Sequence, residues 1–205
     1  MSAIAVPAHR PVLADALAPH RTRVQDAGLV LAGAGLVALL AQLTIPLPLV
    51  PITGQTLGVI LVGAALGSRR GAAALLTYLL VGLAGAPVFA QFMGGPASVL
   101  SPSFGFLLGF IPAAFVAGWF AERAWDRKPL LAMAGFVAAS VVPFLLGVPY
   151  LAMILNAVMG AELGLGGILA AGVWPFIAGG VVKAAIAALL IPAAWRAVRS
   201  LDERR

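Results

Sequence analysis

Residues 103–121 read SFGFLLGFIPAAFVAGWFA and contain no charged side chain. A helix that spans a membrane needs roughly 20 consecutive, mostly apolar residues, and this stretch is long enough and apolar enough. The charged residues Glu122 and Arg123 follow it directly. Because charges collect at membrane surfaces, this abrupt change predicts a helix that crosses the bilayer and ends at its surface.

The rest of the chain has the same character. Of its 205 residues, 62% are hydrophobic and 10% are charged. A soluble domain has about 25% charged residues, so a soluble globule is excluded. A disordered chain is excluded as well, because disorder requires low hydrophobicity. The absence of cysteine rules out disulfides, thiolate catalysis and cysteine metal sites. We therefore predict an all-α integral membrane protein.

Five further apolar stretches surround the first one. We predict six transmembrane helices, packed as one domain over residues 27–196. The predicted spans are residues 27–43, 50–67, 71–86, 103–121, 130–155 and 167–195. The polar residues 1–26 predict a flexible cytoplasmic lead, and residues 197–205 a cytoplasmic tail.

The basic residues fall on one side of these six spans. They precede the first span, separate the second from the third and the fourth from the fifth, and follow the last: Arg10, Arg21, Arg23, Arg69, Arg70, Arg123, Arg127, Lys128, Arg196, Arg199, Arg204 and Arg205. The other three connections contain no Lys or Arg. The positive-inside rule then predicts a protein of the cell membrane with both termini in the cytoplasm. The net charge of +6 reflects this topology, and no nucleic acid partner is expected.

Uncharged polar residues gather on the opposite side. They are Gln42, Thr44, Thr53, Gln55, Thr56, Gln91, Ser98, Ser101, Ser103 and Asn156. Amides and hydroxyls in this position favour a pocket for a small polar molecule, whereas any one of them alone could equally be solvating the membrane interface. The connection 87–102 is apolar, rich in glycine and uncharged. We expect it to fold back over the outer end of the bundle, the alternative being a short interfacial hairpin.

Lys183 is the most informative single residue, because it lies inside a predicted span. A lysine at the bilayer centre costs about 2.5–3.5 kcal/mol on insertion scales. At helical spacing, Phe176 and Gly180 share its face, so a ring and a glycine precede the ammonium. We interpret this face as a ligand contact, and a lysine satisfied by backbone carbonyls or reaching the cytoplasmic interface is the alternative.

Several classes of function lack their signatures. The sequence contains no phosphate-binding loop of the G-x-x-x-x-G-K-[ST] type, no metal-ligand cluster, and no histidine outside residues 1–26. An enzyme is therefore not expected, and neither is a cofactor. A carrier subunit, an autonomous secondary transporter and a ligand-free scaffold protein remain as alternatives. Ala34 and Ala38 form a small-residue step that serves helix packing within the chain or docking onto another membrane subunit.

Several segments together resemble the BioY family, the substrate-binding membrane subunits (S-components) of biotin transporters of the energy-coupling-factor type. The segments are VPITGQTLGV at 50–59, ALGSRRG at 65–71, GAPVFA at 85–90, GG at 94–95, SPSFGFLLGF at 101–110, AER at 121–123 and PFIAGGVVK at 175–183. Together these matches are specific and extend over residues 28–195.

The resemblance implies an S-component-like bundle of six helices that captures biotin from the outer face. It also implies a membrane scaffold subunit, on which Ala34 and Ala38 would dock, and a pair of ABC ATPases, although some members of the family are thought to work without them. Two departures stand out: Gly180 replaces a usual Asp, and Phe106 replaces a common Tyr.

These considerations give a hypothesis for the site. Lys183 pairs with a carboxylate or another polar group of the ligand beside Gly180. Phe89, Phe104, Phe176 and Tyr150 supply apolar walls, and Gln55, Gln91 and Ser103 supply hydrogen bonds. Because Gly180 lacks the acidic group, a related anionic vitamin or precursor is the alternative ligand.

Overall fold

The computed structural model describes residues 11–17 and 22–202. Predictions about residues 1–10, 18–21 and 203–205, including most of the flexible lead, lie outside this part. The described chain is helical apart from one two-stranded hairpin. In order, its elements are α1 (Leu13–Leu17), α2 (Arg23–Ala41), β1 (Thr44–Ile45), β2 (Ile52–Thr53), α3 (Gln55–Leu66), α4 (Ser68–Leu83), η1 (Ala90–Phe92), η2 (Pro96–Leu100), α5 (Phe104–Ala121), η3 (Trp125–Arg127), α6 (Pro129–Met153), η4 (Ile154–Val158), α7 (Leu165–Gly172) and α8 (Trp174–Asp202).

The all-α membrane class is confirmed in its coarse form. Within the described residues, four helical stretches are long and apolar enough to cross a membrane, and they cover residues 23–41, 104–121, 129–158 and 165–200. The helices α3 and α4 are shorter than these. They nevertheless coincide in order with the second and third predicted spans.

Most predicted spans differ from the observed helices by a few residues at their ends, and two of them differ in a way that has a structural cause. The second begins only at Gln55, because Pro46, Pro48 and Pro51 interrupt the preceding chain, which forms the antiparallel pair β1–β2. The sixth is divided into α7 and α8 at Val173, whose dihedral angles are not helical. Pro175 is consistent with this break, because proline has no backbone N–H to donate to the carbonyl oxygen of Ala171, four residues earlier, and its ring would clash with that carbonyl group in a continuous helix.

The centre of the bundle is α5, which packs against α3, α4 and α6. Close approach depends on glycine: a Cβ atom at Gly71 would lie 2.9 Å from the Cα atom of Gly63. Gly67 has a φ of +88°, a conformation that favours glycine, and it lets α3 turn directly into α4. Side chains of small volume therefore bring three helices together where a larger residue would hold them apart.

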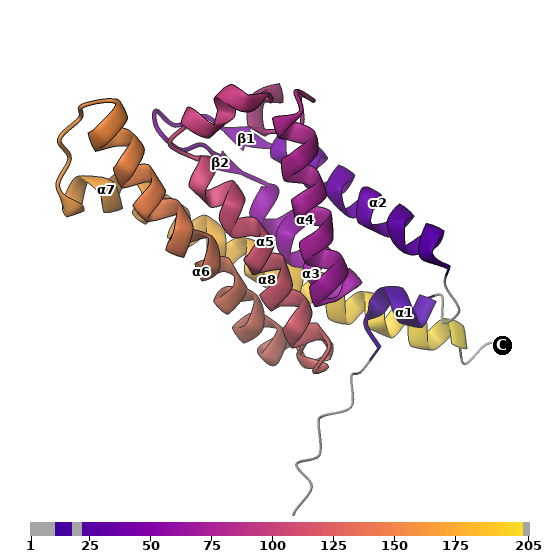
Figure 1. The fold of residues 1–205 in the computed structure, drawn as a ribbon. Coiled ribbons are helices and arrows are strands. Elements are labelled where there is room, and N and C mark those ends of the chain that lie inside the picture. Colours follow the sequence, from indigo (N-terminus) through magenta and orange to yellow (C-terminus); the bar gives the residue numbers. More distant parts are fainter. Residues whose placement is uncertain (1–10, 18–21, 203–205) are drawn as a thin grey trace, which may run out of the picture.

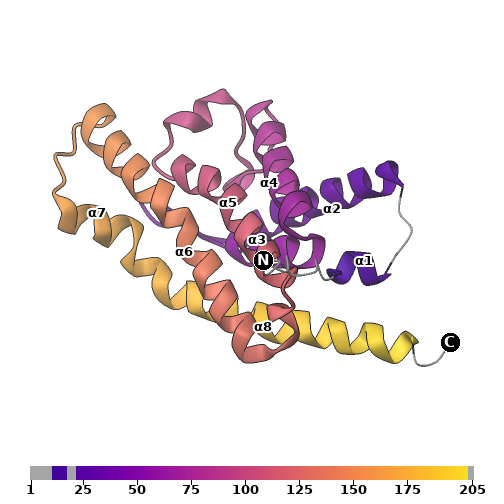
Figure 2. The same ribbon diagram turned by 60° about the horizontal axis from the view of Figure 1, so that its bottom comes forward.

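The bundle has two different ends (Figure 1). The strands β1 and β2 and the short helices that follow α4 gather at one end, which we call the hairpin end. At the other end, α1 lies beside the C-terminal part of α8, as Figure 2 also shows. We call this the basic end, because Arg70, Arg123, Arg127 and Arg196 lie there.

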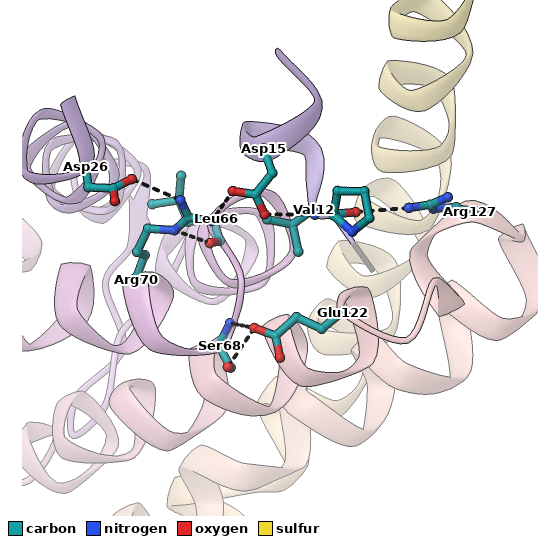
Figure 3. A network of polar contacts seen from close by, with 9 residues as sticks. Val12, Asp15, Asp26, Leu66, Ser68, Arg70, Glu122 and Arg127 are labelled. Carbon is teal, nitrogen blue, oxygen red and sulfur yellow. Dashed lines mark hydrogen bonds and ion pairs between the residues drawn. The ribbon is translucent and has the colours of Figure 1, made fainter. Parts of the chain in front are cut away.

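Ion pairs tie the helices of the basic end together (Figure 3). The guanidinium of Arg70 lies 2.6 Å from Asp15 of α1 and 3.0 Å from Asp26 of α2, and it also donates to the carbonyl oxygen of Leu66 at 2.8 Å. Beside it, Ser68 donates from both its backbone N–H and its hydroxyl to the same carboxylate oxygen of Glu122, each at 2.7 Å. These contacts join α1, α2, α4 and α5.

A first prediction concerns this network. We expect Arg70→Ala to lower the melting temperature of the detergent-solubilised protein by roughly 2–8 °C, since partly exposed ion pairs contribute about 1–2 kcal/mol together. Arg69→Ala is the matched control, because Arg69 is the preceding basic residue and is exposed. Equal shifts for the two variants would contradict the role of the network.

A second buried contact at the basic end involves Asp126, which is 0% exposed. Trp195 of α8 donates to its Oδ2 atom at 2.6 Å, while its Oδ1 atom has no hydrogen-bond partner among the described residues. Burial raises the pKa of Asp126 to about 6 from 3.8, and the hydrogen bond from Trp195 and the charge of Arg127 oppose this shift. The folded protein therefore holds a proton there that the unfolded chain releases at lower pH.

The second prediction follows from the sign of this shift. Stability falls as pH rises from about 4 to about 6, because the folded state binds the additional proton in that range. We expect Asp126→Asn, which keeps an acceptor for Trp195, to melt at a higher temperature than the parent protein at pH 7.5. The gain has an upper limit of about 3 kcal/mol, or roughly 10 °C, and disappears below pH 4. Glu162→Gln, at an exposed carboxylate, should show no such pH-dependent gain.

Candidate functional site

A cavity lies near the hairpin end, between α3, α5, α6, α8 and the connection that follows α4. It is mostly apolar and includes one charged residue. Its lining residues are Val50, Pro51, Thr53, Gln55, Thr56, Phe89, Ala90, Met93, Ser98, Ser101, Ser103, Phe106, Leu107, Phe110, Ser140, Pro143, Phe144, Phe176, Gly180 and Lys183. The connection 87–102, which we expected to fold over the bundle, thus supplies part of the wall.

Lys183 projects into this cavity from α8. Its Nζ atom donates to the backbone carbonyl oxygen of Thr53 at 2.5 Å, which ties α8 to the end of β2. The side chain is partly buried and forms no ion pair within the described part of the chain. Phe176 and Gly180 line the same cavity, so the predicted face of α8 is present. Lys183 therefore has two features at once: its ammonium contacts a backbone carbonyl oxygen, and its side chain lines a cavity.

Gln55 is buried and bonded within the protein. Its Oε1 atom accepts from the hydroxyl of Thr53 at 2.8 Å, and its Nε2 atom donates to the hydroxyl of Tyr78 at 2.7 Å. Tyr78 in turn packs edge to face on Phe89, with ring centroids 5.5 Å apart. Both the oxygen and the nitrogen of the Gln55 amide are therefore hydrogen-bonded within the protein. Gln55 holds the cavity wall in place and leaves neither atom without a partner.

Other hydroxyls are arranged more freely. The Oγ atoms of Ser101 and Ser103 are 2.9 Å apart, and either can be the donor. Ser98 lines the cavity beside them in the chain. The Oγ1 atom of Thr56 is buried and has no hydrogen-bond partner among the described residues. These groups can donate to and accept from a ligand.

Aromatic rings form the wall between these polar groups. Phe106, Phe144 and Phe176 contact one another, with centroid separations of 5.7, 6.3 and 6.4 Å. They come from α5, α6 and α8 respectively, so the wall depends on the packing of three helices. Such a surface suits the apolar body of a small molecule.

Six of the predicted site residues line the cavity, namely Lys183, Gln55, Ser103, Phe89, Phe176 and Gly180. Three others lie elsewhere. Gln91 is exposed, at a φ of 59° within η1. Phe104 is buried in the core and packs against Tyr150, whose hydroxyl donates to the carbonyl oxygen of Val99.

Ser140 and Phe144 also line the cavity, although neither was predicted as a site residue. A signal was present, since Ser140 is the single serine in the predicted span 130–155 and Phe144 lies one turn later on the same face. Phe106 was noted only as a replacement for a tyrosine, yet it contacts two other rings of the wall.

The two alanines proposed for docking differ in exposure. Ala34 is 8% exposed and belongs to the core, because α2 packs against α3 and α4. Its small side chain therefore serves packing within this chain. Ala38 is partly buried and lines a shallow groove on α2 with Ala32, Gly35 and Leu39.

Curated relatives match most of the chain. It is 40% identical over 148 residues to the biotin transporter BioY of Rhizobium etli, covering 69% of this chain and 75% of the relative. It is 36% identical to the biotin transporter BioY of Thermotoga maritima, covering 73% and 83%. It is 32% identical to the probable biotin transporter BioY of Pyrococcus horikoshii, covering 82% and 94%.

The fold also matches a solved structure, described as the S-component for biotin from an ECF-type ABC transporter. The TM-score is 0.64, with 86% of this chain and 95% of that chain covered. At 22% identity, this likeness concerns the fold. The family model named BioY family matches residues 14–200, nearly the whole of the described chain. With the relatives and the cavity, this match shows that the chain is a member of the BioY family.

Proposed function

We propose that this chain is the substrate-capture membrane subunit of a biotin uptake transporter. The cavity carries this proposal, because it combines an apolar aromatic wall, several hydroxyl groups and one ammonium. Biotin has a matching composition: an apolar body with a neutral ureido group at one end and a carboxylate at the other. Membership of a transporter family supports a transport protein and not an enzyme.

The proposal includes the arrangement in the membrane. Six crossings, with α3 and α4 as short spans and α7 and α8 as one interrupted span, are supported by the alternation of connections that contain Lys or Arg with connections that contain neither. The same alternation supports a plasma-membrane protein with the basic end in the cytoplasm, so that the cavity opens toward the outer face. Residues 27–196 then form the transmembrane domain.

The proposed partners follow from the same role. Uphill transport needs ATP hydrolysis, and this sequence has no phosphate-binding loop of the Walker type. A membrane scaffold subunit and a pair of ABC ATPases would supply it. On α2, the exposed groove at Ala38 is a better docking surface than the buried Ala34.

Lys183 contributes only part of the binding energy. A hydrogen bond to a charged group contributes about 1.5–3 kcal/mol, whereas nanomolar binding requires about −12 kcal/mol. Burial of the ligand against the aromatic wall must supply most of the remainder. We propose Lys183, Ser103, Phe89 and Phe176 as direct contacts, and Gln55 as a residue that positions them.

The third prediction tests this proposal. Purified protein should bind radiolabelled biotin, and Lys183→Met should weaken binding about 10- to 100-fold through loss of the charged contact. Lys128→Met, at an exposed position at the basic end, is the control and should leave binding unchanged. If the parent protein fails to bind at micromolar biotin, the ligand assignment is wrong. Unchanged binding by Lys183→Met would exclude its role in the site.

A further inference from the structure

Residues 89–93 form a closed turn between α4 and η2. The backbone N–H of Phe89 donates to the carbonyl oxygen of Met93 at 2.9 Å, and the N–H of Met93 donates to the carbonyl oxygen of Ala90 at 3.3 Å. Phe89, Ala90 and Met93 also line the cavity. The conformation of this turn therefore decides where one part of the cavity wall lies.

The centre of the turn has an unfavourable backbone conformation. Gln91 has a φ of 59° and Phe92 a φ of 56°, and neither residue is a glycine. Left-handed backbone costs free energy in a residue with a side chain, so two such residues in succession persist only where the surrounding structure holds them. The turn therefore depends on contacts from outside.

Gln42, which directly follows α2, supplies such contacts. Its Nε2 atom donates to the carbonyl oxygen of Phe89 at 3.1 Å, and its Oε1 atom accepts from the backbone N–H of Phe92 at 3.0 Å. The same Nε2 atom donates to the carbonyl oxygen of Ala38 at 3.0 Å, which fixes the side chain to its own helix. Gln42 is partly buried and does not line the cavity. It thus binds the turn from outside the cavity.

The side chain of Phe89 is held in a different way. Its ring is 3% exposed and packs edge to face on Tyr78, with ring centroids 5.5 Å apart. Gly82 of α4 leaves space for this ring, because a Cβ atom there would collide with it. Loss of the Gln42 amide would leave this apolar contact in place. The change would therefore loosen the backbone of the turn without opening the core.

The segment around the turn also belongs to the groove on α2. Pro87, Val88 and Phe92 line this groove together with Gln42. Residues of one short segment thus face the ligand cavity and the groove in close succession, and Gln42 is hydrogen-bonded to that segment on the groove side. A partner that occupied the groove would contact the same segment that forms part of the cavity wall.

We infer that Gln42 is a positioning residue for the ligand cavity. It holds residues 89–93 in the conformation that completes the wall, and it connects this wall to the groove on α2. The inference rests on the proposed function, because it concerns how tightly the cavity holds biotin. Gln42 itself has no contact with the cavity, so its effect on the ligand passes through the turn.

The fourth prediction concerns Gln42→Met, which keeps the length of the side chain and removes both the donor and the acceptor. We expect the purified full chain with this change to bind biotin about 5- to 50-fold more weakly at pH 7.5, the range expected for two lost hydrogen bonds. Gln25→Met is the matched control, because Gln25 is an exposed glutamine in the first turn of α2, at the opposite end of the same helix. It should leave binding unchanged.

Gln42→Glu separates positioning from a general loss of stability. When ionised, this side chain can accept from Phe92 but cannot donate to the carbonyl oxygen of Phe89, and protonation restores the donor. The ratio of its biotin affinity to that of the parent protein should rise at least about 2-fold from pH 7.5 to pH 5. None of the residues that line the groove has an ionisable side chain, and the ratio for Gln42→Met should stay constant.

The position of the turn can also be measured without ligand. Because the chain contains no cysteine, Ala90→Cys introduces a single thiol at a cavity residue that is 7% exposed. It should react slowly with a water-soluble maleimide, and at least about 5-fold faster when combined with Gln42→Met, since the loosened turn opens more often. Phe92→Cys, at a residue that is 70% exposed, should react rapidly in both backgrounds.

The outcomes separate this inference from biotin capture. Equal biotin affinity of the parent protein and Gln42→Met would overturn the positioning role and leave biotin capture intact. A Gln42→Glu variant whose relative affinity does not rise at pH 5 would also overturn it, and this variant decides the question if Gln42→Met does not fold. If the parent protein does not bind biotin, biotin capture is rejected. The labelling of Ala90→Cys then still decides whether Gln42 holds the turn, and equal rates in the two backgrounds would show that it does not.

Discussion

The contact between the Lys183 ammonium and the carbonyl oxygen of Thr53 is the constraint on which the site depends. It joins α8, the last helix, to β2, which precedes α3 in the chain. Because Thr53 also donates to Gln55, and Gln55 to Tyr78, the same contact continues into α4 and the packing of Phe89. A single, partly buried cation thus connects three helices around the cavity. Inside a membrane, a polar group without a hydrogen-bond partner costs free energy, so this series of hydrogen bonds is difficult to rearrange.

The parts of the fold that the sequence predicted are those governed by composition and periodicity. Apolar length predicted where helices lie, whereas the three prolines before α3 delay its start relative to the predicted span 50–67. Lys183, Gly180 and Phe176 share one face of α8 because helical spacing alone decides it. The break between α7 and α8 was missed, although Pro175 was visible, because a proline in the first turn is compatible with either a new helix or a continued one.

The role of a site residue was harder to predict where its hydrogen bonds come from residues distant in the sequence. Gln55 has the chemistry of a ligand contact, but Thr53 and Tyr78 engage its amide, and Tyr78 is 23 residues away. Gln91 is exposed, adopts a left-handed conformation in η1 and does not line the cavity. Gln42 instead forms hydrogen bonds to this connection. Its Nε2 atom donates to the carbonyl oxygen of Phe89, and its Oε1 atom accepts from the backbone N–H of Phe92. No pattern in the sequence distinguishes these three glutamines.

The division of charge between the two ends also bears on function. At the basic end, carboxylates of Asp15, Asp26 and Glu122 meet donors from other helices, so the polar groups there serve cohesion. Near the hairpin end, Lys183 contacts a carbonyl oxygen and, among the described residues, pairs with no carboxylate. A protein that must both hold and release its ligand gains from this difference. If an internal carboxylate already neutralised Lys183, the ligand would have to displace it, and the affinity gained from the ligand's own charge would be smaller.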